Sequence, residues 1–156
     1  MKQFFALLVL AHALIHLMGP AKAFELAELP QLTQPITKPA GVIWLVAAVL
    51  LAVAAAALLA WPRWWWAVGA LALVVSQAVI FTSWSDAKYG TVANVILLVG
   101  VVFGYLSQGP SSLRAEYERG VDRELARAHQ TSVVTEADLA HLPELVQRYL
   151  RTVGVV

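Results

Sequence analysis

The chain has 156 residues, of which 60% are hydrophobic and 13% are charged, with a formal net charge of +1 and no cysteine. Soluble domains usually carry about 25% charged residues, so the composition argues against an ordinary soluble domain. Without cysteine, disulfides, thiolate nucleophiles and cysteine metal sites are excluded. No basic stripe interleaved with aromatic residues is present, so nucleic acid is not expected as a partner.

The charged residues divide the chain into two regions. Between residues 3 and 108 every charged residue lies between apolar stretches: Lys22, Glu25, Glu28, Lys38, Arg63, Asp86 and Lys88. From residue 109 onwards the charge density is that of a soluble protein. We therefore predict a membrane region over residues 1–108 and a charged helical tail over residues 109–156.

Four apolar stretches predict transmembrane helices over residues 3–19, 40–61, 64–84 and 91–108. The two central stretches would each reach about 30 Å as helices, which matches the hydrocarbon core of a bilayer. Residues 40–59 have no charged, hydroxyl or amide side chain, whereas buried helices of soluble proteins keep a polar stripe. The predicted fold class is all-α: a four-helix transmembrane bundle with a short helical cytoplasmic tail.

The first stretch has a second interpretation that stays open. Lys2, the apolar stretch and Ala21-Lys22-Ala23 together resemble a signal peptide with a small-x-small cleavage site. His12 and His16 are unusual in a signal core, and the stretch leads directly into a loop towards the second span. These features favour a retained first helix, with cleavage as the alternative.

Proline and tryptophan mark the links between the spans. Four prolines predict a loop over residues 20–39, in which residues 24–32 are candidates for a short interfacial helix. Residues 61–66 are a tryptophan-rich turn that suits the headgroup level of a bilayer. Residues 83–90 are a second tight turn.

Lysine and arginine predict the sidedness of the chain, because they accumulate in cytoplasmic loops. With four spans, the N-terminus, the 61–66 turn and the tail share one side, which carries Lys2, Arg63, Arg114, Arg119, Arg123 and Arg127. The opposite side carries Lys22, Lys38 and Lys88. Both termini are therefore predicted to be cytoplasmic.

Two helices are predicted in the tail. Ser111 or Ser112 caps the first, which runs to about His129 and carries an apolar stripe with a spacing of four residues. The second begins at Thr135, is interrupted or restarted at Pro143 and ends near residue 152. The tail is too short for an independent core, so its first helix is expected to need a partner surface.

Most polar side chains of the predicted spans are expected to gather towards the outer ends of the helices, with His12 as the exception nearer mid-depth. Ionisable and amide side chains in lipid are costly and usually face a bundle interior or a cavity. They bond to one another and hold the helices together, or they line an outward-facing pocket for a small ligand or a headgroup, with a catalytic or proton-relay site as a third interpretation. The candidate ligand-binding residues are His12, His16, Gln77, Asp86, Lys88 and Asn94, with Ser76 beside them.

No catalytic or metal-binding pattern accompanies these residues. His12 and His16 share one helix face, and Asp86 would be the third ligand of a metal site, but an H-E-x-x-H pattern is absent. The other two histidines, His129 and His141, lie in the tail, so the bundle offers no opposed pair for a haem. No nucleophile–base–orienter set is evident, and a non-enzymatic protein without a metal is expected.

Gly100 and Gly104 form a G-x-x-x-G pattern, which allows another helix to approach closely. We expect that helix to come from the same chain. A homo-oligomer or a partner membrane subunit is the alternative.

Several stretches resemble known bacterial membrane proteins. Residues 11–19, with the sequence AHALIHLMG, and residues 22–24 resemble small four-helix membrane proteins of the DoxX-like kind. Residues 29–36, 83–91 with Asn94, 142–143 and 146–150 resemble an uncharacterised bacterial family in which such a membrane region precedes a longer, β-rich soluble domain. The resemblance covers nearly the whole chain, its motifs carry no known chemistry, and this chain stops where that domain would begin.

The resemblance implies a multi-pass protein of the bacterial inner membrane, and either a fragment of a longer protein or a truncated reading frame. We expect a non-enzymatic anchor or scaffold module that positions a cytoplasmic domain or a partner. The alternative is a quinone-binding subunit of a membrane oxidoreductase complex, because DoxX relatives include a quinone-linked thiosulfate-oxidising subunit. A small transporter is disfavoured, since the spans lack intramembrane charges and paired broken helices.

Overall fold

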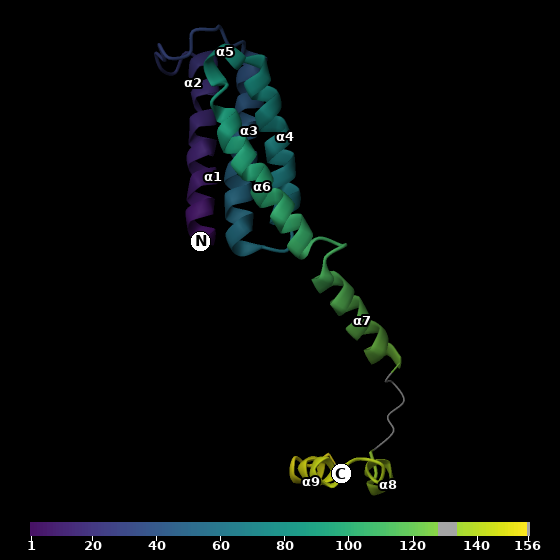
Figure 1. Cartoon of the computed structure of the whole chain (residues 1–156). Helices are drawn as coiled ribbons and strands as arrows, with labels where there is room; N and C mark the ends of the chain where they lie inside the picture. Colours follow the sequence, from purple (N-terminus) through teal and green to yellow (C-terminus); the bar gives the residue numbers. More distant parts are fainter. Residues whose placement is uncertain (128–133, 156) are drawn as a thin grey trace. The chain divides into compact units, whose positions relative to one another are not determined.

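The computed structural model describes residues 1–127 and 134–155. These residues form helices and connecting segments and contain no β-strand, which confirms the all-α prediction (Figure 1). The chain divides into two compact units, Met1–Tyr117 and Glu118–Val156, so the division falls beyond the compositional boundary at residue 108. Each unit is described by itself.

Four helical stretches of the chain are long and apolar enough to cross a membrane. The first is Lys2–Ala23, made of α1 (Lys2–His16) and α2 (Met18–Ala23). The others are α3 (Lys38–Ala60), α4 (Trp65–Thr82) and the apolar helix α6 (Gly90–Gln108). At about 1.5 Å per residue these helices match a hydrocarbon core of about 30 Å. The chain is therefore a multi-pass membrane protein.

Proline explains the interruption between α1 and α2. In a continuous helix the backbone nitrogen of Pro20 would donate to the carbonyl oxygen of His16, but proline has no N–H. α1 accordingly ends at His16, and Leu17 joins it to α2 with near-helical dihedral angles (φ −67°, ψ −15°). The first span thus remains one stretch with a local break beside its histidines.

The spans pack in the order α1, α3, α4, α6, and α6 also touches α1 over a short stretch (Figure 1). The N-terminus and the C-terminal end of α6 lie at one end of the bundle. The loop over residues 24–37 and the one-turn helix α5 (Trp84–Ala87) lie at the other end, which we call the loop end.

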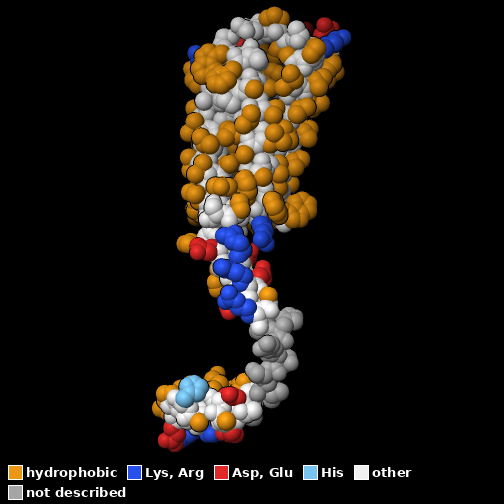
Figure 2. All heavy atoms as spheres, turned by 90° about the vertical axis from the view of Figure 1, so that its right-hand side faces the viewer, with side chains coloured by type: hydrophobic (Ala, Val, Ile, Leu, Met, Phe, Trp, Pro, Cys, Tyr) orange, Lys and Arg blue, Asp and Glu red, His pale blue; other side chains and the backbone are white. Residues whose placement is uncertain are grey.

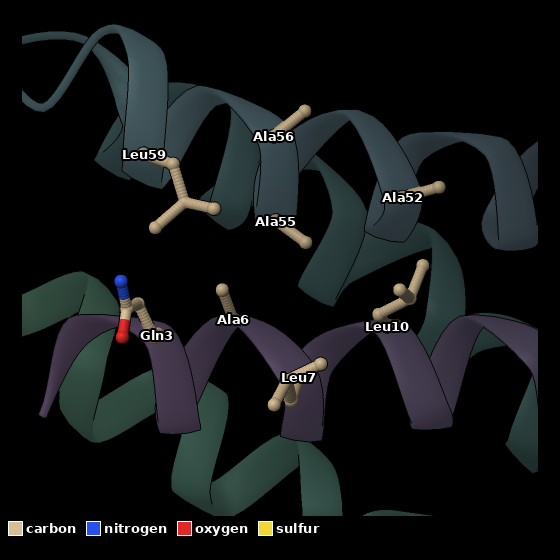
Figure 3. Close-up of a pocket in the computed structure, with 8 residues that line it drawn as sticks. All are labelled: Gln3, Ala6, Leu7, Leu10, Ala52, Ala55, Ala56 and Leu59. Carbon is tan, nitrogen blue, oxygen red and sulfur yellow. The ribbon is translucent and has the colours of Figure 1, made fainter.

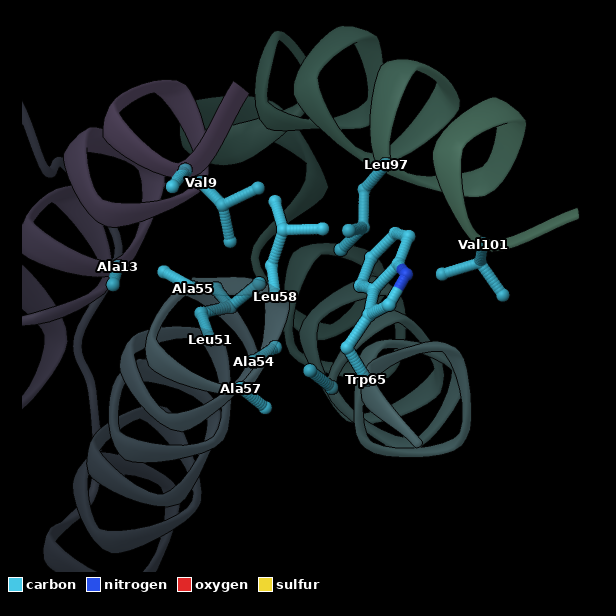
Figure 4. Close-up of a cluster of buried hydrophobic side chains, with 12 residues drawn as sticks. Val9, Ala13, Leu51, Ala54, Ala55, Ala57, Leu58, Trp65, Leu97 and Val101 are labelled. Carbon is cyan, nitrogen blue, oxygen red and sulfur yellow. The ribbon is translucent and has the colours of Figure 1, made fainter. Parts of the chain in front are cut away.

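Alanines of α3 let its neighbours pack closely, as small residues do at helix interfaces in membranes. Leu51 and Leu58 of α3 project among these alanines, and the indole of Trp65 lies between Leu97 and Val101 of α6 (Figure 4). The cluster consists of Ala6, Val9, Ala13, Leu51, Ala54, Ala55, Ala57, Leu58, Trp65, Ala72, Leu97 and Val101.

Large apolar side chains cover the sides of the bundle, and the charged side chains in view lie at its ends (Figure 2). Side chains between 64% and 74% exposed include Phe4, Leu7, Val74, Phe81 and Phe103. An apolar surface of this extent suits a lipid environment and would favour aggregation in water.

The link between the first two spans does not contain the short helix that the sequence suggested. Residues 24–32 form turns, bends and irregular backbone instead of a short interfacial helix, so that expectation is wrong. α2 ends at Ala23, Glu25 takes a left-handed conformation (φ 57°), and Pro30 restricts the backbone further. α3 then begins with Thr37, whose hydroxyl oxygen accepts a hydrogen bond from Ala40 N–H (3.4 Å).

The other two links follow the predicted turns. Residues 61–64 join α3 to α4, and the indole of Trp66 donates to the Arg63 carbonyl oxygen (3.1 Å). Residues 83–89 join α4 to α6 and contain α5.

The first tail helix, α7 (Leu113–Arg127), begins after Ser112, whose Oγ accepts a hydrogen bond from Ala115 N–H (3.1 Å). The structure thus selects Ser112 as the cap. The predicted end near His129 lies outside the described residues.

In the second unit, α8 (Glu136–Leu139) starts at a capping box of Thr135 and Asp138, and α9 (Glu144–Thr152) follows Pro143 as predicted. Arg151 joins the two helices through an ion pair with Glu136 (2.6 Å). This hydrogen-bonded ion pair lowers the pKa of the Glu136 carboxyl.

Candidate functional site

The buried polar side chains of three spans meet near the loop end of the bundle. His12 and His16 come from α1, Ser76 from α4 and Asn94 from α6, and each is at most 5% exposed. Gln77 of α4 lies beside them and is partly buried. The sequence prediction that most polar side chains gather at one level is therefore confirmed, and His12, which was expected nearer mid-depth, also contacts Ser76 and Asn94.

The hydroxyl of Ser76 is the centre of the network. Its Oγ lies 2.8 Å from His16 Nε2, 3.3 Å from His12 Nε2 and 3.0 Å from Asn94 Oδ1. His12 Nε2 also lies 3.1 Å from Asn94 Oδ1. One small side chain of α4 thereby connects α1 to α6.

The network continues from Asn94 to the edge of the bundle. Asn94 Nδ2 donates to Gln77 Oε1 (3.0 Å), and Gln77 Nε2 donates to the hydroxyl oxygen of Thr91 (3.2 Å). This chain of donors orients both amides, so Asn94 presents its carbonyl oxygen to His12 and Ser76.

We assign the protons of the two histidines from the amide orientation. Asn94 Oδ1 only accepts, so Ser76 donates its single hydroxyl proton to it and His12 donates from Nε2. The oxygen of Ser76 is then left to accept, and His16 donates to it from Nε2. In an uncharged ring whose Nε2 carries the hydrogen, Nδ1 is an acceptor.

Next to the network, two ring nitrogens have no partner. The rings of His16 and Trp44 lie with their centroids 5.2 Å apart, and Gly19 leaves the space that the indole occupies. Trp44 is 4% exposed. His16 Nδ1 and Trp44 Nε1 are both buried without a hydrogen-bond partner among the described residues. Unpaired buried polar atoms are uncommon in folded proteins and call for an explanation.

A cavity of about 300 Å³ adjoins these two rings. Most of its wall is apolar, and its polar lining residues come from α1, α3 and the links at the loop end. The complete lining is His12, Ile15, His16, Met18, Gln31, Leu32, Trp44, Ile80, Asp86, Ala87, Tyr89, Gly90 and Ala93.

Asp86 lies at the cavity but outside the network. Its carboxylate accepts hydrogen bonds from the Thr33 hydroxyl (2.7 Å) and from Gln34 N–H (2.9 Å). The Gln34 N–H and then the Thr33 hydroxyl lower the pKa of the Asp86 carboxyl. Asp86 therefore holds the first loop against α5.

Lys88 does not line the cavity. Its ammonium lies over the ring of Tyr89, 5.5 Å from the centroid, in a cation–π contact. The structure thus joins five of the predicted polar residues through hydrogen bonds, places Asp86 at the cavity wall and leaves Lys88 apart.

A second contact secures the same loop. Lys22 of α2 donates to the carbonyl oxygen of Leu32, and the Leu32 side chain is buried against the cavity. The two attachments, from α2 and α5, hold Leu32 over the space beside His16.

Sequence reasoning missed Trp44, Thr91 and Leu32. Trp44 stands alone in an alanine-rich span. Its neighbour Gly41, which allows α2 to approach, is the sequence feature that could have indicated close packing at Trp44. Thr91 at the start of α6 is one turn before Asn94, so helical spacing places both on one face.

The larger groove of the bundle is apolar and separate from the network. It measures about 500 Å³, lies between α1 and α3, and has alanine and leucine along most of its length with Gln3 near one end (Figure 3). A groove of this kind suits a lipid acyl chain. Its lining residues are Gln3, Ala6, Leu7, Leu10, Ala52, Ala55, Ala56 and Leu59.

Gly100 and Gly104 serve packing within the chain. A Cβ atom at Gly100 would collide with the ring of Phe5 from α1, and one at Gly104 would lie 2.9 Å from the indole of Trp65 from α4. Each glycine therefore makes room for an aromatic ring of a neighbouring span, and the predicted role in packing within the chain holds in this form.

The histidines and Asp86 do not converge on one point. Both Nε2 atoms face Ser76, while the Asp86 carboxylate binds the loop. Within residues 1–127 and 134–155, no three histidine, aspartate or glutamate side chains are grouped as a metal would require.

No protein-family model, curated protein or solved structure matches this chain. The resemblance to DoxX-like proteins thus remains a prediction from the sequence.

Proposed function

We propose that the chain is a non-enzymatic membrane module of the bacterial inner membrane, in which a braced four-helix bundle anchors the tail and positions a partner or a cytoplasmic domain. The observation that carries the proposal is the network centred on Ser76. His12, Ser76 and Asn94 form hydrogen bonds with one another and so connect α1, α4 and α6. Such bonds stabilise helix contacts in lipid.

The proposed orientation places both termini in the cytoplasm and the loop end outside. It is supported by the lysine and arginine count, with Lys2, Arg63 and the four arginines of α7 on one side against Lys22, Lys38 and Lys88 on the other. Single cysteines in this cysteine-free chain test it with a membrane-impermeant maleimide on intact cells. We expect labelling of Ser85→Cys and protection of Ser112→Cys until the membrane is permeabilised. Labelling of Ser112→Cys in intact cells would overturn the orientation.

A quinone-binding subunit of a DoxX-like oxidoreductase is the second candidate. The cavity beside His16 and Trp44 favours it, because about 300 Å³ is within the lower range of small-molecule sites. A partner subunit or a second copy of the chain would then meet the bundle at a surface other than the occupied faces of Gly100 and Gly104.

Extraction of the purified protein separates the two candidates. We expect no stoichiometric quinone in the extract, and lower melting temperatures for Asn94→Leu and His16→Leu. One quinone per chain, lost from these variants while their melting temperatures stay unchanged, would reject the scaffold proposal in favour of the redox subunit. Leu98→Ala, which shortens an exposed side chain of α6, is the control variant.

A further inference from the structure

Two residues of the cavity lining, His16 and Trp44, each carry a buried ring nitrogen without a partner in the described part of the chain, and these two nitrogens have opposite hydrogen-bonding characters. Trp44 Nε1–H can only donate. His16 Nδ1 can only accept, because the network assigns the ring hydrogen of His16 to Nε2, which faces Ser76. The two rings are neighbours, with centroids 5.2 Å apart, and both line the cavity.

We propose that this cavity binds an uncharged amphiphile through a single hydroxyl group. The hydroxyl oxygen accepts the hydrogen bond of Trp44 Nε1–H, and the hydroxyl proton is donated to His16 Nδ1. One O–H group therefore satisfies both buried nitrogens. The site goes beyond the scaffold role and does not depend on it.

Other polar groups match the pair less well. A carbonyl oxygen accepts from Trp44 but faces the lone pair of His16 Nδ1. An ammonium donates to His16 and repels the indole N–H. Asp86 is the one charged side chain in the described lining, and its carboxylate disfavours an anionic headgroup such as that of a fatty acid.

The rest of the cavity suits the apolar part of such a molecule. Met18, Leu32 and Ile80 supply apolar wall. Ile15 also lines the cavity and is 56% exposed on the side of α1, so a hydrocarbon tail can leave past it into the bilayer. The hydroxyl would then lie near the loop end, at the level where lipid headgroups begin.

Photolabelling of the full-length protein in nanodiscs tests the proposal. The probe is a long-chain alcohol with a diazirine in its chain, and its matched comparisons are the methyl ether and the hydrocarbon with the same diazirine. All three partition into the bilayer, so lipid-facing residues report general labelling. We expect the alcohol alone to enrich labelling of the cavity-lining segments around residues 15–18 and 80–93, by at least severalfold over the ether.

Two variants remove the nitrogens that would hold the hydroxyl. Trp44→Phe deletes an N–H that has no partner in the protein, so the melting temperature should change little while the enrichment is lost. His16→Gln keeps an amide N–H near the position of Nε2 for Ser76 and lacks the Nδ1 acceptor. Trp61→Phe, at an exposed indole outside the cavity, is the matched control and should keep full enrichment.

Equal labelling by the alcohol and the ether would overturn the proposal, because the hydroxyl group would then play no part in binding. Enrichment that survives in both Trp44→Phe and His16→Gln, each folded as judged by melting, would overturn it as well. An aliphatic alcohol and a phenol share the required hydroxyl. Competition with unlabelled decanol and with a short-tailed alkylphenol shows which of them displaces the probe, and displacement by either one supports the site.

Discussion

His12 and Asn94, 82 positions apart in the chain, are joined by a hydrogen bond of 3.1 Å between Nε2 and Oδ1. This bond connects the first span to the last, which otherwise touch over a short stretch. Since α1 packs on α3, α3 on α4 and α4 on α6, the bond closes the bundle near its loop end.

Replacement of Ser76 by alanine removes the centre of the network. The change deprives His16 Nε2 and Asn94 Oδ1 of a partner in a fully buried position. Hydrogen bonds between membrane helices contribute about 0.6 kcal/mol on average and up to about 1.7 kcal/mol, so we expect a loss of about 1–2 kcal/mol. Unfolding in mixed micelles with increasing SDS measures it. Ser85→Ala, at an exposed hydroxyl, should leave the midpoint unchanged, and an unchanged midpoint for Ser76→Ala would contradict the role of the network.

Alanine at Gly100 should destabilise the bundle by about 1–3 kcal/mol through overpacking. The added methyl group would collide with the ring of Phe5, so Phe5→Leu should recover part of the loss in the double variant. Gly120→Ala is the control, because nothing lies within 4 Å of the new Cβ, and it should not lower the unfolding midpoint. If Gly100→Ala instead changed oligomeric state at constant stability, as measured by light scattering, the glycine would serve an interface between chains.

The attachment of the first loop to Asp86 should depend on pH. Its hydrogen bonds from Gln34 N–H and Thr33 lower the pKa of the carboxyl below the ordinary value of 3.8. The attachment is therefore fully present above that value and is lost as the pH falls through the lowered pKa. Hydrogen exchange at the Gln34 amide measures the attachment. The quantity compared is the protection of this amide in the wild type and in Asp86→Ala. We expect a clear difference at neutral pH and its loss as the pH falls through the lowered pKa, whereas equal protection at neutral pH would show that the loop is held by other contacts.

Much of the fold follows from the sequence because a lipid environment restricts the backbone structures that a chain can adopt. Apolar stretches of about 20 residues without charge can only be helices there, so the spans were predictable to within a few residues. The histidines, Ser76, Gln77 and Asn94 were predictable as a group, since a polar side chain in a span avoids lipid.

The details of the site depend on contacts that no local pattern encodes. The partnership of His16 with Trp44 requires α1, α2 and α3 to meet at Gly19, which hydropathy does not reveal. The interfacial helix expected over residues 24–32 was wrong because Glu25 and Pro30 end regular structure, while the preceding residues extend the first span. The role of Asp86 depends on a loop more than 50 positions earlier in the chain.

A double-mutant cycle between His12→Leu and Asn94→Leu, measured by unfolding in mixed micelles, tests most directly whether the polar network braces the bundle. The account predicts that the two losses are coupled by about 0.6–1.7 kcal/mol, because either substitution already breaks the bond that joins α1 to α6. Losses that add to within about 0.3 kcal/mol would show that the two side chains do not stabilise the bundle through each other.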